Sequence, residues 1–160
     1  MSISVGISEY KIAKAPQSLA TYGLGACVAI AIYDLSAGQA ALAHSLLPNP
    51  TEGIMQYLGT AKFTSSAVDL MIEELLKNGC TPTGLMAKLA GGASIFNERY
   101  HSARRDMGAR NIAAARASLE RHGIPIIAED IGGDYGRSIE FIVCTGVMKV
   151  RSVKNGEKAI

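Results

Sequence analysis

The sequence predicts a single α+β domain in which two helices pack against one mixed β-sheet. Three observations favour this class. The chain has 160 residues, of which 48% are hydrophobic and 19% are charged, as in one globular domain. Predicted strands outnumber predicted helices, and short turns join several of them. Strands and helices do not alternate regularly, as they would in a doubly wound parallel sheet. We expect one domain over residues 1–153 and a flexible tail over residues 154–160.

The first third of the chain predicts three strands. Ile3–Ala13 mixes apolar and polar residues and is the weakest of them. Ala26–Tyr33 is an unbroken apolar run, which is typical of a strand buried on both faces. Turn residues occupy 34–38, and Gln39–Leu47 then continues as a strand that ends before two prolines. A loop is predicted over residues 50–59.

Two segments predict helices. Residues 60–78 carry apolar side chains at helical spacing, with charged residues on the other side and Gly79 at the expected C-terminus. The apolar positions are Val68, Met71, Ile72, Leu75 and Leu76. Residues 108–122 are rich in alanine and arginine, and Gly123 and Pro125 follow them.

The remaining segments predict strands and one loop. Residues 83–89 form a strand that ends at a glycine pair, and residues 96–106 form a polar, basic loop. Residues 124–131 and 137–144 are predicted as two strands of a hairpin around a glycine-rich turn. Residues 147–153 predict a last strand.

Composition excludes several classes of protein. The longest apolar run has only eight residues, whereas a membrane-spanning helix needs about 20. The N-terminus lacks the basic segment and apolar core of a signal peptide. The three cysteines cannot all pair with one another, which suits free thiols in a reducing compartment. We therefore expect a cytoplasmic protein without membrane insertion. The net charge of +2 is too small to indicate nucleic acid.

No motif indicates a metal or a cofactor. The three histidines, His44, His101 and His122, are far apart, and no Cys-x-x-Cys or His-x-x-x-His spacing occurs. Gly23 and Gly25 lack the third glycine of a dinucleotide-binding loop, since Val28 stands there. The glycine pairs at 91–92 and 132–133 lack the Lys-Ser/Thr of a phosphate-binding loop, so taken alone they indicate turns.

Other polar residues have ordinary interpretations. A basic stretch could dock an acidic partner, but a solvated loop and helix start is the simpler interpretation. Its members are Arg99, His101, Arg104, Arg105 and Arg110. Cys80 follows the first helix and Cys144 ends an apolar strand, and both are interpreted as ordinary small apolar or loop residues.

Cys27 stands in a different context. It follows Gly23-Leu24-Gly25-Ala26, where small residues let a substrate approach the backbone at the entrance to a buried strand. If residues 27–33 pair with residues 38–44 around the intervening turn, Cys27 and His44 stand opposite each other on one face. A slip of one residue would place them on opposite faces. The sequence therefore permits this pair without requiring it.

The pair has a known chemistry. A neighbouring imidazolium lowers the pKa of a thiol, and the thiolate can attack an amide or ester carbonyl. The same histidine can protonate the departing ammonia and then activate water. Thr21 lies six residues before Cys27 and is able to orient the imidazole, although a single threonine predicts nothing by itself.

Five ordered motifs resemble the CheD family, the chemoreceptor glutamine deamidases of bacterial and archaeal chemotaxis. They are Thr21 with residues 23–28, residues 43–48, residues 87–93, residues 108–111, and residues 130–133 with Gly136 and Arg137. The resemblance extends over nearly the whole chain. It implies a fold similar to that of the cytotoxic necrotizing factor toxins, which are cysteine hydrolases acting on glutamine.

The resemblance also implies the site and the reaction. Cys27 matches the family's nucleophile, His44 its general base and Thr21 the supporting residue. The implied reaction converts receptor glutamine to glutamate and ammonia, and related proteins also hydrolyse glutamate methyl esters. No cofactor is implied. The implied partners are chemoreceptor cytoplasmic domains and a CheC-type phosphatase, so the protein is expected as a monomer or as a heterodimer with the phosphatase.

The chain departs from the family pattern at three places. Ala26 replaces the usual serine before the nucleophile, Ala40, Ala41 and Leu42 replace a glycine pair and a methionine, and the loop before Gly108 is longer. These departures motivate an alternative, an adaptor that binds and regulates a CheC-type phosphatase with little or no catalysis. A papain-like protease is disfavoured, because such enzymes separate cysteine and histidine by more than about 100 residues and add an asparagine.

Overall fold

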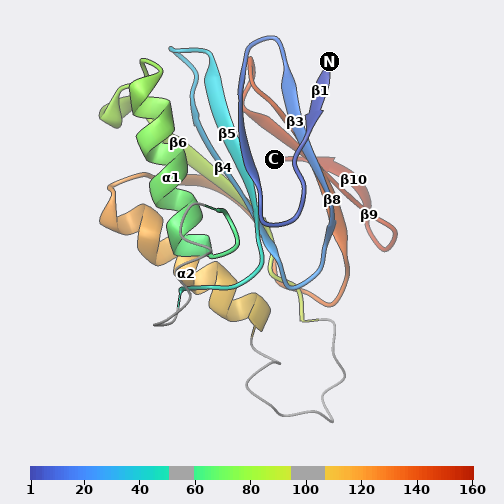
Figure 1. Cartoon of the computed structure of the whole chain (residues 1–160). Helices are drawn as coiled ribbons and strands as arrows, with labels where there is room; N and C mark the ends of the chain where they lie inside the picture. The colour runs from blue at the N-terminus through green and yellow to red at the C-terminus, as the bar shows by residue number, and fades with distance from the viewer. Residues whose placement is uncertain (51–59, 95–106) are drawn as a thin grey trace.

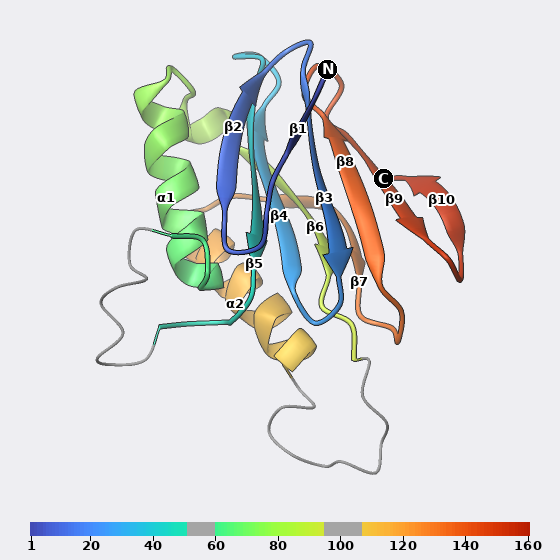
Figure 2. The same cartoon turned by 45° about the vertical axis from the view of Figure 1, so that its right-hand side comes forward.

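The computed structural model describes residues 1–50, 60–94 and 107–160. These residues form three layers, which Figure 2 shows side by side. Two helices, α1 (Thr64–Lys77) and α2 (Met107–Arg121), cover one face of a five-stranded central sheet. A second five-stranded sheet, the outer sheet, covers the other face. The two main helices and the α+β class predicted from the sequence are confirmed.

The central sheet has the strand order β2-β5-β4-β6-β7. Its strands are β2 (Tyr10–Lys14), β4 (Val28–Asp34), β5 (Gln39–Ser45), β6 (Met86–Gly91) and β7 (Ile126–Ile131). The short 3-10 helix η2 (Pro82–Gly84) precedes β6. Neighbouring strands are antiparallel except for β6 and β7, which are parallel, so the sheet is mixed.

The outer sheet has the order β1-β3-β8-β9-β10. Its strands are β1 (Ser2–Ser4), β3 (Ser18–Leu24), β8 (Arg137–Ile142), β9 (Val147–Ser152) and β10 (Gly156–Ala159). β1 and β3 are parallel and the other pairs are antiparallel.

Two hydrophobic cores lie on the two faces of the central sheet. The core beneath the helices includes Ile30, Met71 and Leu119. The core between the sheets includes Leu42 and Phe141. Since both faces of the central sheet are covered, β4 and β5 are buried along their whole length. This burial explains the unbroken apolar run at residues 26–33 and confirms the prediction of a strand buried on both faces.

Three predictions about the strands were wrong. One sheet was expected and two are present. Ile3–Ala13 is not one strand, because β1 joins the outer sheet and β2 the central sheet. Residues 124–144 do not form a hairpin, because β7 pairs with β6 whereas β8 pairs with β3 and β9. The glycine-rich segment 132–136 therefore passes from one sheet to the other. Short turns in the sequence do not reveal which sheet the next strand joins.

Two further segments differ from expectation. No strand was expected at Ser18–Leu24, which is β3. The segment expected as a flexible tail contains β10, which pairs with β9. The loops predicted over residues 50–59 and 96–106 fall almost entirely on residues 51–59 and 95–106, outside the described ranges. No helix within the described ranges is long and apolar enough to cross a membrane.

Candidate active site

The three residues predicted as the site lie on three neighbouring segments. Thr21 is on β3 of the outer sheet, His44 is near the end of β5, and Cys27 immediately precedes β4. β4 and β5 pair with Val28 opposite Ser45 and Ala29 opposite His44. The expected pairing of Cys27 directly opposite His44 is therefore wrong by two residues. Because side chains alternate with a period of two, Cys27 and His44 still belong to the same face, the one toward the outer sheet.

A hydrogen bond to Thr21 fixes the tautomer of His44. The Thr21 hydroxyl donates to the Val5 carbonyl at 2.7 Å and lies 2.7 Å from His44 Nδ1. A hydroxyl has one proton, and here the carbonyl accepts it, so Nδ1 must donate its own proton to Thr21 Oγ1. In the neutral imidazole this leaves Nε2 unprotonated. Within the described residues Nε2 is buried and has no hydrogen-bond partner. The ring thus presents a base that is free to accept a proton.

Burial keeps both reactive groups neutral in the absence of substrate. It lowers the pKa of His44 and raises the pKa of the Cys27 thiol. The Cys27 backbone N–H acts in the opposite direction on the thiol pKa, but more weakly than burial. The expectation that an imidazolium depresses the thiol pKa is therefore not met. Both shifts favour the uncharged forms, a thiol and an imidazole.

The N-terminal segment anchors His44 and Thr21. Ser8 N–H donates to the His44 carbonyl at 2.9 Å, and His44 N–H donates to the Glu9 carbonyl at 3.0 Å. Val5 N–H donates to the Ala20 carbonyl at 2.8 Å, which holds Val5 beside Thr21. Sequence reasoning missed Val5, since its contribution is a backbone carbonyl and gives no side-chain signal.

The end of β6 packs against the backbone of Cys27. Gly92 N–H donates to the Cys27 carbonyl at 2.8 Å, and Ala93 N–H donates to the Gly25 carbonyl at 2.9 Å. Gly91 has φ +103°, and a Cβ there would lie 2.4 Å from the Cys27 carbonyl oxygen. The glycine pair at 91–92, which taken alone indicated a turn, is thus where the end of β6 contacts the backbone of the candidate nucleophile.

A buried arginine joins this region to the outer sheet. Arg137 donates to Asp130 at 2.9 Å, to the Gly91 carbonyl at 3.2 Å and to the Gly132 carbonyl at 2.6 Å. Its side chain is 1% exposed and that of Asp130 is 4% exposed. Asp130 and Arg137 come from the central and outer sheets, respectively, so the pair connects the two layers beside Gly91.

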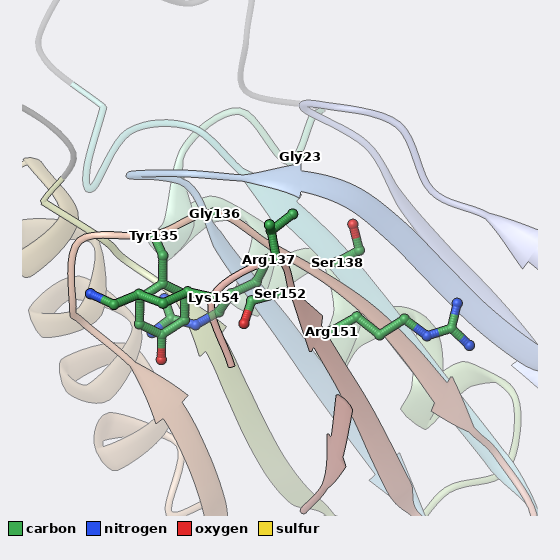
Figure 3. A pocket seen from close by; sticks show the side chains of 9 residues that line it. Gly23, Tyr135, Gly136, Arg137, Ser138, Arg151, Ser152 and Lys154 are labelled. Atoms are coloured by element: carbon green, nitrogen blue, oxygen red, sulfur yellow. The ribbon is translucent and has the colours of Figure 1, made fainter. Parts of the chain in front are cut away.

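Arg137 also borders a cavity of about 630 Å³ on the outer sheet, shown in Figure 3. Its walls come from Gly23, the start of β8, and the end of β9 with Val153 and Lys154. The Tyr135 ring lies over the Arg137 guanidinium at 4.2 Å. Cys27 and His44 do not line this cavity. The cavity is therefore separate from the candidate nucleophile and base, although Gly23 belongs to the same glycine-flanked segment as Cys27.

The other cysteines, His122 and the described part of the basic stretch lie away from Cys27 and His44 in sequence and have ordinary surroundings. Cys80 is buried in the core beneath the helices, and Cys144 is exposed. His122 Nε2 lies 2.7 Å from Asp69 at the surface. Arg110 is exposed on α2, and the other four members of the basic stretch lie outside the described residues. No cluster of three or more potential metal ligands occurs in the part of the chain that the structure describes.

Comparisons with known proteins identify relatives along nearly the whole chain. The family model for CheD, described as chemotactic sensory transduction, matches residues 46–152. The probable chemoreceptor glutamine deamidase CheD 2 of Geobacter metallireducens is 56% identical over 158 residues, covering 99% of this chain and 98% of that protein. The chemoreceptor glutamine deamidase CheD of Bacillus subtilis is 40% identical over 158 residues, covering 99% and 95%.

A solved structure was also found. The hypothetical protein YfiH of Bacillus licheniformis superposes with a TM-score of 0.43 at 17% identity, over 76% of this chain and 49% of that one.

Proposed function

This chain belongs to the CheD family, and we propose that it is a chemoreceptor glutamine deamidase with Cys27 as nucleophile, His44 as general base and acid, and Thr21 as the residue that orients His44. One observation carries the assignment of roles. Thr21 Oγ1 accepts a hydrogen bond from His44 Nδ1–H, which leaves Nε2 as a buried base. This base lies on the face of the central sheet to which Cys27 also belongs.

The reaction begins with proton transfer from a neutral pair. His44 Nε2 takes the thiol proton of Cys27 as the sulfur attacks the side-chain carbonyl carbon of a receptor glutamine. The resulting imidazolium is stabilised by its Nδ1–H bond to Thr21. The carbonyl oxygen becomes an oxyanion, and the Cys27 backbone N–H, which already interacts with the sulfur, is a donor able to stabilise it.

The second half of the reaction restores the enzyme. The His44 imidazolium gives its proton to the departing nitrogen, so ammonia leaves and a thioester to Cys27 remains. A water molecule gives one proton to His44 Nε2 and attacks the thioester. Collapse of this intermediate releases glutamate and returns the proton to the sulfur. Each turnover thus consumes one water and produces one ammonia, without an oxidant, a metal or a cofactor.

Replacement of the usual serine by Ala26 does not remove this oxyanion donor. The donor is a backbone N–H, which any residue before Cys27 leaves in place. The Ala26 carbonyl, on the same peptide unit, is held by a hydrogen bond from helix α2. We therefore expect catalysis to be retained with alanine at position 26.

The substrate partner in this proposal is a chemoreceptor, and a CheC-type phosphatase is a second proposed partner. The phosphatase interaction follows from family membership alone. An adaptor without catalysis would bind the phosphatase and leave receptor glutamines unchanged, so the reaction product separates the two functions.

The test is intact-mass analysis of receptor cytoplasmic fragments after incubation with the protein. Each glutamine converted to glutamate adds about 1 Da, because hydrolysis replaces an amide by a carboxyl group. The wild type should produce this shift and release ammonia, and Cys27→Ala should produce neither. Cys80→Ala and Cys144→Ala are matched controls that should retain activity. An active Cys27→Ala variant would exclude the proposed nucleophile. No shift with the wild type would favour the adaptor.

A further inference from the structure

Helix α2 places a buried carboxamide against the two chain segments that contain the proposed nucleophile and base. Asn111 Nδ2 donates to the Ala26 carbonyl at 2.9 Å and to the Leu46 carbonyl at 3.1 Å. Ala26 immediately precedes Cys27, and Leu46 follows His44 by two residues. Asn111 is 0% exposed. Both hydrogens of its nitrogen are thus used on backbone carbonyls that flank the candidate site.

The position of α2 leaves Asn111 little freedom. At the start of the helix, a Cβ on Gly108 would lie 2.5 Å from the carbonyl oxygens of both Gly92 and Ala93. Gly92 and Ala93 themselves hold the backbone of Cys27 and Gly25. The first turn of α2, the end of β6 and the Cys27 segment therefore form one closely packed unit, and Asn111 is its side-chain hydrogen-bond donor.

The hydrogen bond to Ala26 sets the direction of the Cys27 N–H. The Ala26 carbonyl and the Cys27 N–H belong to one peptide unit, and in a planar trans peptide the two groups point in opposite directions. Because the carbonyl points to α2 on the helix side of the central sheet, the N–H points away from α2, toward the face on which His44 lies. Gly92 fixes the next peptide unit through the Cys27 carbonyl. Both peptide units that contain Cys27 backbone atoms are thus held in place.

Asn111 is not explained by helix stability or by core packing. Asparagine is a weaker helix former than alanine or leucine. Its side-chain oxygen is buried without a hydrogen-bond partner among the described residues, which is unfavourable in a purely structural position. What the side chain provides is a pair of donors at a fixed place.

We propose that Asn111 is a positioning residue for the deamidation reaction. It orients the Ala26–Cys27 peptide so that the Cys27 N–H faces the developing oxyanion, and it ties this peptide to the strand end that carries His44. The proposal rests on the proposed function, since the oxyanion belongs to that reaction.

Two substitutions test this role. Asn111→Leu removes both donors without adding charge, and Asn111→Asp keeps the shape of the side chain but removes the N–H groups. We expect each to lower kcat for receptor deamidation by about 100-fold with a change in KM of less than about threefold, because a misplaced Cys27 N–H would stabilise the transition state less while substrate binding is unchanged. Ser118→Ala is the matched control, since Ser118 is buried on the same helix two turns beyond Asn111. It should leave both constants unchanged.

A second readout separates positioning from general disorder of the site. In a background with Cys80→Ala and Cys144→Ala, Cys27 is the only thiol, and iodoacetamide alkylates it without forming an oxyanion. Asn111→Leu should alkylate within about threefold of the background rate while its kcat falls about 100-fold. A parallel fall in both rates, or an unchanged kcat in either folded Asn111 variant, would overturn the proposal. A wild type that deamidates nothing would instead refute the proposed function.

Discussion

At the scale of single residues, hydrogen bonding and burial define the chemical state of the site. The Thr21 hydroxyl donates its one hydrogen bond to the Val5 carbonyl, so His44 carries its proton on Nδ1 and presents Nε2 as a base. Burial favours the uncharged forms of both His44 and Cys27. In the mechanism we propose, Cys27 attacks only as its proton moves to His44, whereas a thiolate–imidazolium pair would be reactive without substrate.

The pH dependence of Cys27 alkylation tests this neutral pair. In the variant that retains only Cys27, iodoacetamide should react more slowly at pH 7 than with a free cysteine, because a raised pKa leaves less thiolate. The rate should rise with pH and reach its midpoint above the pKa of a free thiol. Faster alkylation than that of a free cysteine at pH 7 would indicate an ion pair and contradict this view. For deamidation, the lowered pKa of His44 predicts that the acid limb lies below about pH 6.5, the usual histidine value.

At the scale of elements, the site depends on strand ends and on a helix start rather than on any one motif. Thr21 is on β3 and His44 on β5, and they meet because the two sheets stack face to face. Cys27 is held from β6 through Gly92, and its preceding peptide is held from α2 through Asn111. Gly91 lets β6 approach the Cys27 carbonyl, because any Cβ at that position would collide with it.

Gly91→Ala should therefore cost both stability and activity. We expect about 3 kcal/mol of destabilisation, from the left-handed φ of +103° together with the collision at Cys27. Gly79→Ala is a matched control, since Gly79 has φ +99° but no atom within 4 Å of the added Cβ. It should cost about 1 kcal/mol and leave kcat unchanged. Urea denaturation and receptor deamidation measure the two effects, and equal losses in both variants would mean that the contact with Cys27 is unimportant.

At the scale of the whole molecule, the central sheet is enclosed by two hydrophobic cores, and the outer sheet has to keep its position for Thr21 to reach His44. The buried pair of Arg137 and Asp130 links the two sheets beside Gly91. Lys158 from β10 adds a second ion pair to Asp130 at 2.6 Å. The C-terminal strand thus contributes to the same junction between layers.

Arg137→Leu should destabilise the fold by about 3 kcal/mol, near the lower end for a broken buried pair, because Lys158 still neutralises Asp130. Arg151→Leu breaks an ion pair with Glu157 between exposed side chains and serves as control. It should leave the urea midpoint unchanged within error. Similar midpoints for the two variants would show that the sheet junction does not depend on the buried pair.

Much of the fold follows from local patterns in the sequence. Helical periodicity predicted α1 and an apolar run predicted β4, because these patterns record which side chains are buried. Composition and terminating residues predicted α2, and the turn before it and the prolines after it delimited β5. The assignment of strands to sheets did not follow. β3 was missed because its apolar and polar residues are mixed, and β7 and β8 were joined as a hairpin because a glycine-rich turn looks the same whether the chain reverses within a sheet or crosses to another.

The site divides in a similar way. The residue types at Cys27, His44 and Thr21, and their resemblance to one family, are properties of the sequence, and they were enough to predict the reaction and the residues proposed to carry it out. The tautomer of His44, the neutral state of the pair and the role proposed for Asn111 follow only from tertiary structure. Each depends on a backbone carbonyl or on burial that a segment distant in sequence provides. The identity of His44, Cys27 or Asn111 does not reveal which carbonyl lies beside it or how deeply it is buried.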